Sequence, residues 1–314
     1  MQTNKIKKAK LGLALGSGAA RGWSLIGILK QLKLMGLKPD IIVGCSIGSL
    51  VGAAYCTDTL EELEAWVKTL DTWQVIKLLD WGMGQGGMVA GGKLFTQLET
   101  TLGSTQIEGC ETEYAAVATE LYTGREHVFS QGPILDAIRA SCAIPGVLAP
   151  QFINNHWMID GAVVNPVPVS VCRAMGATHV IAVDLNSGKP QPLTNPHDII
   201  YTDESKHEKQ DQPNRFQDLL GSSKNFIDNM IKKRSLSGPS APGFMAVASG
   251  AIDIMQNRIT RSRLAADPPD ILIQPDVSQI GIMEFNRGEE AINIGIESVN
   301  KVSHLLDEYI GIFK

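Results

Sequence analysis

Two short apolar runs near the start of the chain, each followed by a glycine-containing turn and a helical pattern, constrain the fold more than any other feature. The runs cover Lys10 to Leu15 and Asp40 to Gly44, and each has the length of one buried strand. Trp23 to Met35 carries apolar residues at helical spacing, and Ile47 to Tyr55 is rich in small and apolar residues. A strand–turn–helix unit that occurs twice in succession predicts a parallel sheet covered by helices.

The remaining segments extend this alternation to residue 186, after which the composition changes. Strands are predicted at 114–119, 126–130, 156–159 and 180–185, and helices at 133–141 and 166–175. Residues 59–102 are predicted to be mostly helical around a glycine-rich loop at 82–92. A polar stretch at 186–214 precedes helical patterns at 216–234, 244–264 and 285–313 and a strand at 270–274. We assign residues 1–186 to a core and residues 187–314 to a polar loop and a helical C-terminal extension that completes the same domain.

Charge and cysteine content exclude several classes of protein. The 314 residues carry a net charge of −5, which argues against a nucleic-acid partner because such proteins normally have a basic surface. The five cysteines are odd in number and have no C-x-x-C spacing, so reduced thiols are expected rather than disulfides or a zinc site. The lysine-rich N-terminus precedes an apolar run that is too short, and too interrupted by glycine, for a signal peptide. No stretch of the sequence reaches the roughly 18 apolar residues that a membrane-spanning helix needs. These features predict a cytoplasmic protein.

A G-x-S-x-G motif links the second predicted strand to the helix that follows it. Its glycines are Gly44 and Gly48, and its serine is Ser46. This context suits a nucleophile, because a sharp turn lifts the hydroxyl above the sheet and points helix amides toward developing negative charge. Small residues are required because side chains at the flanking positions would clash with the neighbouring strand and helix. The alternative is a serine that caps the helix.

A second glycine-containing turn follows the first predicted strand and opens a helix. A dinucleotide-binding turn would need an acidic residue about 20 residues on, at the end of the second strand, but Asp40 lies at its start. An oxyanion hole is the other interpretation, since backbone amides in a tight turn at a helix start bind negative charge. Parallel neighbouring strands would place this turn beside Ser46. The candidate residues are Gly16, Ser17, Gly18, Ala19, Arg21 and Gly22.

A serine nucleophile needs a base, and an aspartate is the best candidate. Asp160 ends a predicted strand and is followed by Gly161 and Ala162, as expected of a carboxylate in a site loop, although a turn aspartate would have the same pattern. None of the six histidines lies in a comparable glycine-flanked turn. A Ser-Asp-His triad of the α/β-hydrolase type is the rival, but only one strand–helix unit precedes Ser46, whereas several strands precede the nucleophile in that fold.

In combination, these motifs resemble those of the patatin-like phospholipase family. The family has a glycine-rich turn with a downstream Arg-Gly, then G-x-S-x-G, then Asp-Gly-Ala or Asp-Gly-Gly; Gly16 to Gly22, Gly44 to Gly48 and Asp160 to Ala162 follow that order. Residues 140–145 are similar to the family's block of small residues and proline. Residues 267–275 resemble bacterial members, especially the RssA-type protein of the neuropathy-target-esterase-like subgroup.

The resemblance implies a three-layer α/β/α fold with a central, mainly parallel sheet. It also implies a serine acyl hydrolase, a lipid esterase or phospholipase A-type enzyme, that needs no metal or cofactor. Ser46 would be the nucleophile and Asp160 the base, first for the serine and then for the hydrolytic water. The amides around Gly18 and Ala19 would hold the oxyanion, with Arg21 supporting the turn.

The chain departs from the family pattern in the glycine-rich turn, where Ser17 and Ala19 replace glycines. Non-glycine residues disfavour positive φ, so either the turn needs no positive φ there or the oxyanion hole is imperfect. The substitutions favour an alternative function, a regulatory or scaffolding protein that keeps the patatin fold with feeble activity. The intact Ser46 and Asp160 favour the enzyme.

The expected partner is an acyl-lipid or another ester, and the sequence is also compatible with a homo-oligomer. The predicted helix at 244–264 has apolar residues at i, i+3, i+4 and i+7, with Arg258, Arg261 and Arg263 near its end. Such a stripe packs on a core, or it forms a cover or an interfacial surface for peripheral contact with an anionic membrane. The stripe comprises Phe244, Ala248, Ala251, Ile252, Met255 and Ile259.

Overall fold

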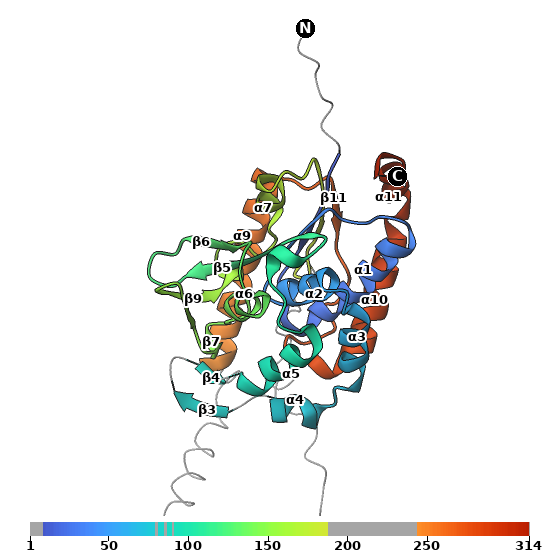
Figure 1. Ribbon diagram of the computed structural model, residues 1–314. Helices are drawn as coiled ribbons and strands as arrows, with labels where there is room; N and C mark the ends of the chain where they lie inside the picture. Colours follow the sequence, from blue (N-terminus) through green and yellow to red (C-terminus); the bar gives the residue numbers. More distant parts are fainter. Residues whose placement is uncertain (1–8, 79–80, 85–86, 90, 188–243, 314) are drawn as a thin grey trace, which may run out of the picture. The chain divides into compact units, whose positions relative to one another are not determined.

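The computed structural model describes residues 9–78, 81–84, 87–89, 91–187 and 244–313, and these residues form a central sheet with helices on both faces (Figure 1). Within the described residues the sheet has eight strands in the order β11-β10-β1-β2-β5-β9-β8, with β6 also pairing with β5. The strands β11, β10, β1, β2 and β5 are parallel, and the pairings of β5 with β6 and β9, and of β9 with β8, are antiparallel. The predicted mainly parallel sheet is therefore confirmed. The strands are β1 Leu11–Leu15, β2 Ile41–Cys45, β5 Glu113–Glu120, β6 Glu126–Phe129, β8 Gln151–Ile153, β9 His156–Asp160, β10 His179–Val183 and β11 Ile271–Ile273.

The parallel strands are buried on both faces, which is why they appear in the sequence as continuous apolar runs. In β1, Leu13 packs in the larger core and Ala14 in the smaller one on the opposite face, as the alternation of side chains along a strand requires. The larger core includes residues of α1 Ser24–Leu34, α2 Ile47–Cys56, α3 Leu60–Thr69, α5 Gly92–Leu102, α6 Ile134–Ser141 and α10 Gly288–Lys301.

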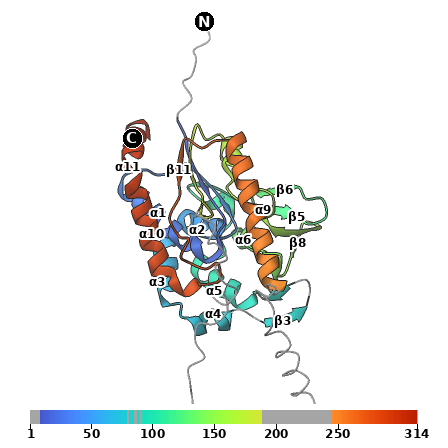
Figure 2. The same cartoon turned by 180° about the vertical axis from the view of Figure 1, so that it is seen from behind.

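The smaller core is covered by α7 Val169–Ala174 and by Leu264 near the end of α9 Phe244–Ala266. Figure 2, the view from behind, shows α10 and the C-terminal part of α9 on opposite sides of the sheet. The sheet thus lies between two helical layers, which confirms the predicted three-layer α/β/α fold.

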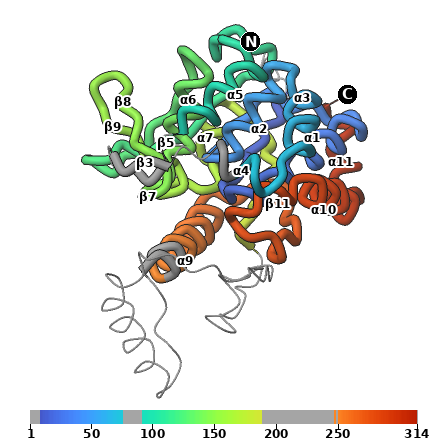
Figure 3. Tube along the Cα trace, turned by 90° about the horizontal axis from the view of Figure 1, so that it is seen from below, coloured from blue at the N-terminus to red at the C-terminus, as the bar shows by residue number. Residues whose placement is uncertain are grey.

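A second, three-stranded sheet was not predicted. The strand β3 Trp81–Gly84 pairs with β4 Gly87–Val89, which in turn pairs with β7 Gly146–Leu148. Part of the glycine-rich segment predicted as a loop is therefore extended and paired. Strands of three or four residues that contain glycine show no alternation of apolar and polar residues, so periodicity could not reveal them. The helix α4 Thr72–Leu78 and α5 flank this segment at the end of the molecule seen in Figure 3.

The C-terminal region differs from the prediction in one respect. A single helix was expected at 285–313. The structure has a 3-10 turn, η4 Phe285–Arg287, followed by α10 and then by α11 Ser303–Phe313. The two helices are separated at Val302, whose φ of −108° and ψ of 11° are not helical. The apolar pattern continues across the break, so the sequence pattern alone could not locate it. Residues 254–313 belong to the same compact unit as residues 9–187, since β11 pairs with β10 and α10 packs on α1.

Helix α9 is present as predicted, but its apolar stripe is not uniformly buried. Met255 is 55% exposed, Ile254 beside it is 65% exposed, and Ile259 is half-buried. The stripe is therefore not a core-facing seam in this part of the helix. The side chains of Phe244 and Ala248, together with the predicted helix at 216–234 and the segment at 188–243, lie outside the described residues.

Candidate active site

Ser46 lies in the turn between β2 and α2, and its hydroxyl contacts Asp160. The Oγ atom donates a hydrogen bond to Asp160 Oδ2 at 2.6 Å, and only 4% of the residue is exposed. The backbone has φ 54° and ψ −125°, a conformation that non-glycine residues rarely adopt. Ser46 occupies the position that precedes the helix, but its side chain forms no capping hydrogen bond. Its hydroxyl is therefore directed to the carboxylate rather than to the helix.

The two motif glycines allow the close packing that the sharp turn requires. A Cβ atom on Gly48 would lie 2.3 Å from the carbonyl oxygen of Leu15, and one on Gly44 would lie 2.4 Å from the backbone of Gly48. Such contacts are shorter than any real Cβ atom makes, so larger residues would separate α2 from β1 and β2. These glycines bring Ser46 close to the first turn.

Asp160 is buried at the end of β9, with only 3% of the residue exposed. Its Oδ1 atom accepts a hydrogen bond from the backbone amide of Ala162 at 2.8 Å, and its backbone carbonyl accepts one from Thr119 Oγ1 at 2.9 Å. Burial raises the pKa of the carboxyl from 3.8 to about 6, and the hydrogen bonds from Ser46 and Ala162 limit the rise. The carboxyl is thus ionised near neutral pH and is a stronger base than an exposed aspartate.

Ser141, a residue that the motifs did not single out, holds the backbone of the nucleophile. The amide of Ser46 donates to Ser141 Oγ at 2.8 Å, and Ser141 Oγ donates in turn to the carbonyl of Val117 at 2.6 Å. The only sequence signal was its place in the small-residue block at 140–145. Because the Ser46 amide is used in this way, donors for an oxyanion must come from elsewhere in the site.

The turn after β1 is the part of the site that the sequence predicts to bind an oxyanion. The pairing of β1 with β2 places this turn beside Ser46, and both Ala19 and Ser46 line one cavity. The amides of Gly16, Ser17, Ala20 and Arg21 donate to backbone carbonyls, at Val183, Pro166, Ile282 and Gly18 respectively. Among the described residues this leaves the turn amides of Gly18 and Ala19 to receive negative charge.

The two residues that replace family glycines differ in conformation. Ser17 is not among the residues with positive φ, whereas Ala19 has φ 48°. Arg21 and Gly22 fix the turn, because Arg21 Nε donates to the carbonyl of Ile280 at 2.9 Å and Gly22 packs directly against the side chain of Ile47. The turn therefore keeps the geometry that suits glycine while carrying an alanine at one position.

Replacing Ala19 with glycine should raise the free energy of unfolding by about 1 kcal/mol, because the left-handed conformation costs an L-residue about that much. Ester hydrolysis should be retained or increased. The matched control is Ala20→Gly, which is buried and lacks positive φ, and which should lower stability by about 1 kcal/mol. Chemical denaturation of the three proteins measures the difference. Equal destabilisation by both substitutions would contradict the role of backbone strain at Ala19.

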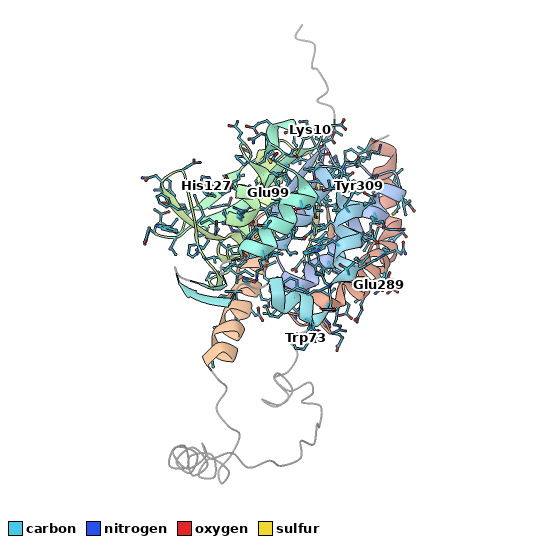
Figure 4. All side chains as sticks on the ribbon, turned by 60° about the horizontal axis from the view of Figure 1, so that its bottom comes forward. Lys10, Trp73, Glu99, His127, Glu289 and Tyr309 are labelled. Carbon is cyan, nitrogen blue, oxygen red and sulfur yellow. The ribbon has the colours of Figure 1, made fainter. Side chains whose placement is uncertain are left out.

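An apolar cavity of about 100 Å³ extends from Ser46. Its lining comes from the 3-10 turn after β1, from α2 to α6, and from the segment before α10. The lining residues are Ala19, Trp23, Ser46, Ile47, Leu50, Trp66, Leu70, Val75, Leu94, Phe95, Leu98, Ile138, Cys142, Ile144, Val147, Leu148, Met283 and Phe285. Met283 is 45% exposed, and Trp73 on α4 is 72% exposed and points outward in Figure 4. The lining is thus almost entirely apolar, and the volume of the cavity is below the range of about 300–1,000 Å³ that is usual for small-molecule sites.

No described histidine contacts Ser46 or lines this cavity. His127 lies on β6 against Phe129 (Figure 4), and His156 Nδ1 is 2.9 Å from Glu120 Oε1. His179 packs against two rings of α11, and His304 lies on α11 itself. His197 and His207 lie outside the described residues. The aspartate is therefore the group that the described structure places on the serine hydroxyl.

The chain is thus a three-layer α/β protein in which a buried Ser–Asp pair lies beside an apolar cavity. The family model for patatin-like phospholipase matches residues 13–173, about half of the chain, and the chain belongs to that family. The predicted family is thereby confirmed. The family comprises lipid hydrolases.

Similar proteins occur in bacteria and animals. An uncharacterised NTE family protein of Mycobacterium tuberculosis is 29% identical over a gapped alignment of 322 positions, which covers 91% of this chain and 89% of that protein. Neuropathy target esterase sws of Drosophila melanogaster is 31% identical over 59% of this chain, and human patatin-like phospholipase domain-containing protein 6 is 32% identical over 56%. These matches span only 13% of each animal protein.

Among the described residues, no group of three or more His, Cys, Asp or Glu side chains is arranged to hold a metal ion. None of their helices has both the length and the apolar character that crossing a membrane would require.

Proposed function

We propose that the chain hydrolyses acyl esters of lipids with Ser46 as nucleophile and Asp160 as base. The observation that carries the proposal is the 2.6 Å hydrogen bond between the two side chains at the apolar cavity. The arrangement fulfils the requirement that a nucleophile and its base lie within hydrogen-bond reach. The strained backbone of Ser46 also suits a nucleophile, since strain of this kind is common at active sites.

The first half of the reaction forms an acyl-enzyme. Ser46 Oγ attacks the carbonyl carbon of the ester while its proton passes to Asp160 Oδ2. The carbonyl oxygen becomes negative and accepts hydrogen bonds from the amides of Gly18 and Ala19. Collapse of this intermediate breaks the bond to the alcohol oxygen, which takes the proton from Asp160 and leaves.

The second half releases the fatty acid. A water molecule gives its proton to Asp160 as its oxygen attacks the acyl carbon. The new intermediate collapses, the bond to Ser46 Oγ breaks, and the serine recovers its proton from Asp160. During both halves the acyl chain lies in the apolar cavity, where burial of each methylene contributes about 0.8 kcal/mol to binding.

A fluorophosphonate probe should label Ser46 covalently, because the activated serine attacks phosphorus as it attacks a carbonyl carbon. Intact-protein mass spectrometry should show one adduct, and peptide mapping should place it on the peptide that contains Ser46. Ser46→Ala protein should not be labelled, whereas Ser298→Ala, which alters a buried serine in α10, should be labelled as the wild type is. Undiminished labelling of Ser46→Ala protein would contradict the assignment.

The positive φ of Ala19 favours a second candidate, a regulatory or scaffolding protein with weak hydrolase activity. In that case the strain at Ala19 would let the turn relax away from the conformation that presents its amide to the oxyanion. The rate of labelling by the probe discriminates the two candidates. If Ala19→Gly raises the labelling rate of a nearly inactive wild type by tenfold or more, about 1.4 kcal/mol, the second candidate is favoured.

A further inference from the structure

A second cavity, of about 350 Å³, lies beyond the carboxyl ends of β10 and β11 and differs in chemistry from the cavity at Ser46. Asp184 follows β10, Gln274 follows β11, and both line the cavity. The last turns of α9 form the facing wall and supply Thr260 and Arg261. Its volume is within the range of small-molecule sites, about 300–1,000 Å³.

The position of the cavity in the sheet is one at which α/β proteins bind ligands. The chain runs from β1 to β2 on one side, whereas β10 lies on the other side of β1 and continues to β11. The strand order therefore reverses between β1 and β10, one strand away from the cavity at β10 and β11. The cavity shares with known sites its position outside the carboxyl ends of the strands, where ligands of open α/β sheets bind.

The inner part of the cavity carries buried polar groups with unused hydrogen-bonding capacity. Thr260 is only 2% exposed, and its Oγ1 atom has no partner among the described residues. Asp184 is 5% exposed; its Oδ1 accepts from the amide of Asn186 at 3.0 Å, and its Oδ2 accepts from Gln274 Nε2 at a long 3.4 Å. An unpartnered buried hydroxyl is unfavourable without a ligand or water, because burial removes its hydrogen bonds to solvent.

The outer part of the cavity carries one cationic side chain, that of Arg261. Arg261 is exposed and lies near enough to Asp184 to lower the pKa of that carboxyl, which burial raises. No ion pair of Arg261 occurs within the described part of the chain. A guanidinium at a cavity mouth suits phosphate, which it binds through two parallel hydrogen bonds. Leu264 and Leu272 provide an apolar wall for a carbon skeleton.

We propose that this cavity binds a small phosphorylated polyol, with its hydroxyl groups at Asp184, Thr260 and Gln274 and its phosphate at Arg261. The hydroxyl groups of such a ligand would donate hydrogen bonds to the buried carboxylate of Asp184 and the buried hydroxyl of Thr260. Its phosphate would supply the anion that the exposed guanidinium of Arg261 requires. The same chemistry occurs in a free polyol phosphate and in the glycerophosphate headgroup of a lipid. Asn186, whose backbone amide donates to Asp184 Oδ1, connects the cavity to the turn after β1, since its Nδ2 donates to the carbonyl of Ser17 at 3.0 Å.

Calorimetric titration of the full-length Ser46→Ala protein tests the proposal without turnover, so its result does not depend on the esterase. Glycerol 3-phosphate and the diester glycerophosphoethanolamine are titrated separately, with inorganic phosphate as a third arm. We expect the polyol phosphate or the diester to bind at least tenfold more tightly than inorganic phosphate. Tighter binding of the monoester identifies a free polyol phosphate, and tighter binding of the diester identifies a lipid headgroup.

Four variants separate a ligand site from a structural cluster. Arg261→Gln should weaken binding by about 10- to 100-fold, as expected for a lost charge-assisted contact, and Arg261→Lys should restore part of it. Thr260→Val should weaken binding without lowering the melting temperature, because it removes a hydroxyl that has no partner in the described structure. Arg258→Gln, on the same helix but outside the cavity lining, should bind as the parent does.

The proposal is overturned if both organic ligands bind more weakly than about 10 mM. It is also overturned if inorganic phosphate binds as tightly as they do, or if Arg261→Gln and Thr260→Val leave the affinity unchanged.

Discussion

Ser46→Ala is expected to lower kcat/KM for ester hydrolysis by about 10⁴- to 10⁶-fold. The acyl-enzyme cannot form without Oγ, and losing the nucleophile of a serine hydrolase has effects of this size. The remaining rate would come from water activated by Asp160 and from binding in the cavity. The measurement is turnover of 4-nitrophenyl esters of increasing acyl length, because the cavity predicts a preference for longer chains over acetate.

The Ser46→Ala comparison needs a folded control. Ser298→Ala removes a buried hydroxyl that donates to the carbonyl of Gly295 in α10 and does not line the cavity. This variant should hydrolyse esters at the wild-type rate. If Ser46→Ala retained more than about a tenth of wild-type activity while folded, another residue would have to be the nucleophile.

The fold could be predicted from the sequence where local patterns and burial agree. The strands β1, β2, β5 and β10 are buried on both faces and therefore appear as apolar runs bounded by turns. Two features could not be predicted: the very short strands β7 and β8, and the break at Val302. The strands are determined by pairing with distant segments, and the break is determined by helix packing. Local propensity contains no information on those partners.

The candidate site, too, could be predicted from the sequence only in part. Ser46 and Asp160 stand in turns with a distinctive pattern, and the structure places them together although 114 positions separate them. The role of Ser141 could not be predicted, since a buried serine in a helix gives no signal of its partner. The lining of the cavity comes from segments as distant as Trp23 and Phe285, which only the folded chain brings together. The catalytic roles themselves stay predictions.

Asp160→Asn is expected to lower kcat/KM by about 10²- to 10⁴-fold, because an amide cannot take the proton of Ser46. No single histidine substitution should reproduce this loss, since no described histidine reaches the serine. Substituting alanine for each histidine in turn, including His197 and His207, provides the comparison. A folded His→Ala variant without activity would replace the dyad by a triad.

The pH dependence of the wild type should follow the ionisation of Asp160. Only the carboxylate accepts a proton, and burial raises its pKa to about 6. Activity should therefore be nearly constant above pH 7 and fall about tenfold per pH unit below 6. The rate of fluorophosphonate labelling between pH 4 and 8 measures this directly, because it does not require substrate ionisation. A pH-independent labelling rate would contradict the assignment of Asp160 as base.

The same pKa shift predicts that removing the base stabilises the protein. The folded-state pKa of Asp160 is raised from 3.8 to about 6, so the folded protein binds this proton more tightly than the unfolded chain does. The stabilisation from that proton is complete below about pH 4 and is lost as the pH rises through 6. At pH 7 the buried carboxylate should therefore destabilise the fold by up to about 3 kcal/mol relative to a neutral group. Asp160→Asn should unfold at a higher temperature than the wild type at pH 7 and at nearly the same temperature at pH 4. A lower melting temperature of the variant than of the wild type at pH 7 would show that the carboxylate stabilises the fold. That result would contradict the inference that Asp160 is held ionised in a desolvated site.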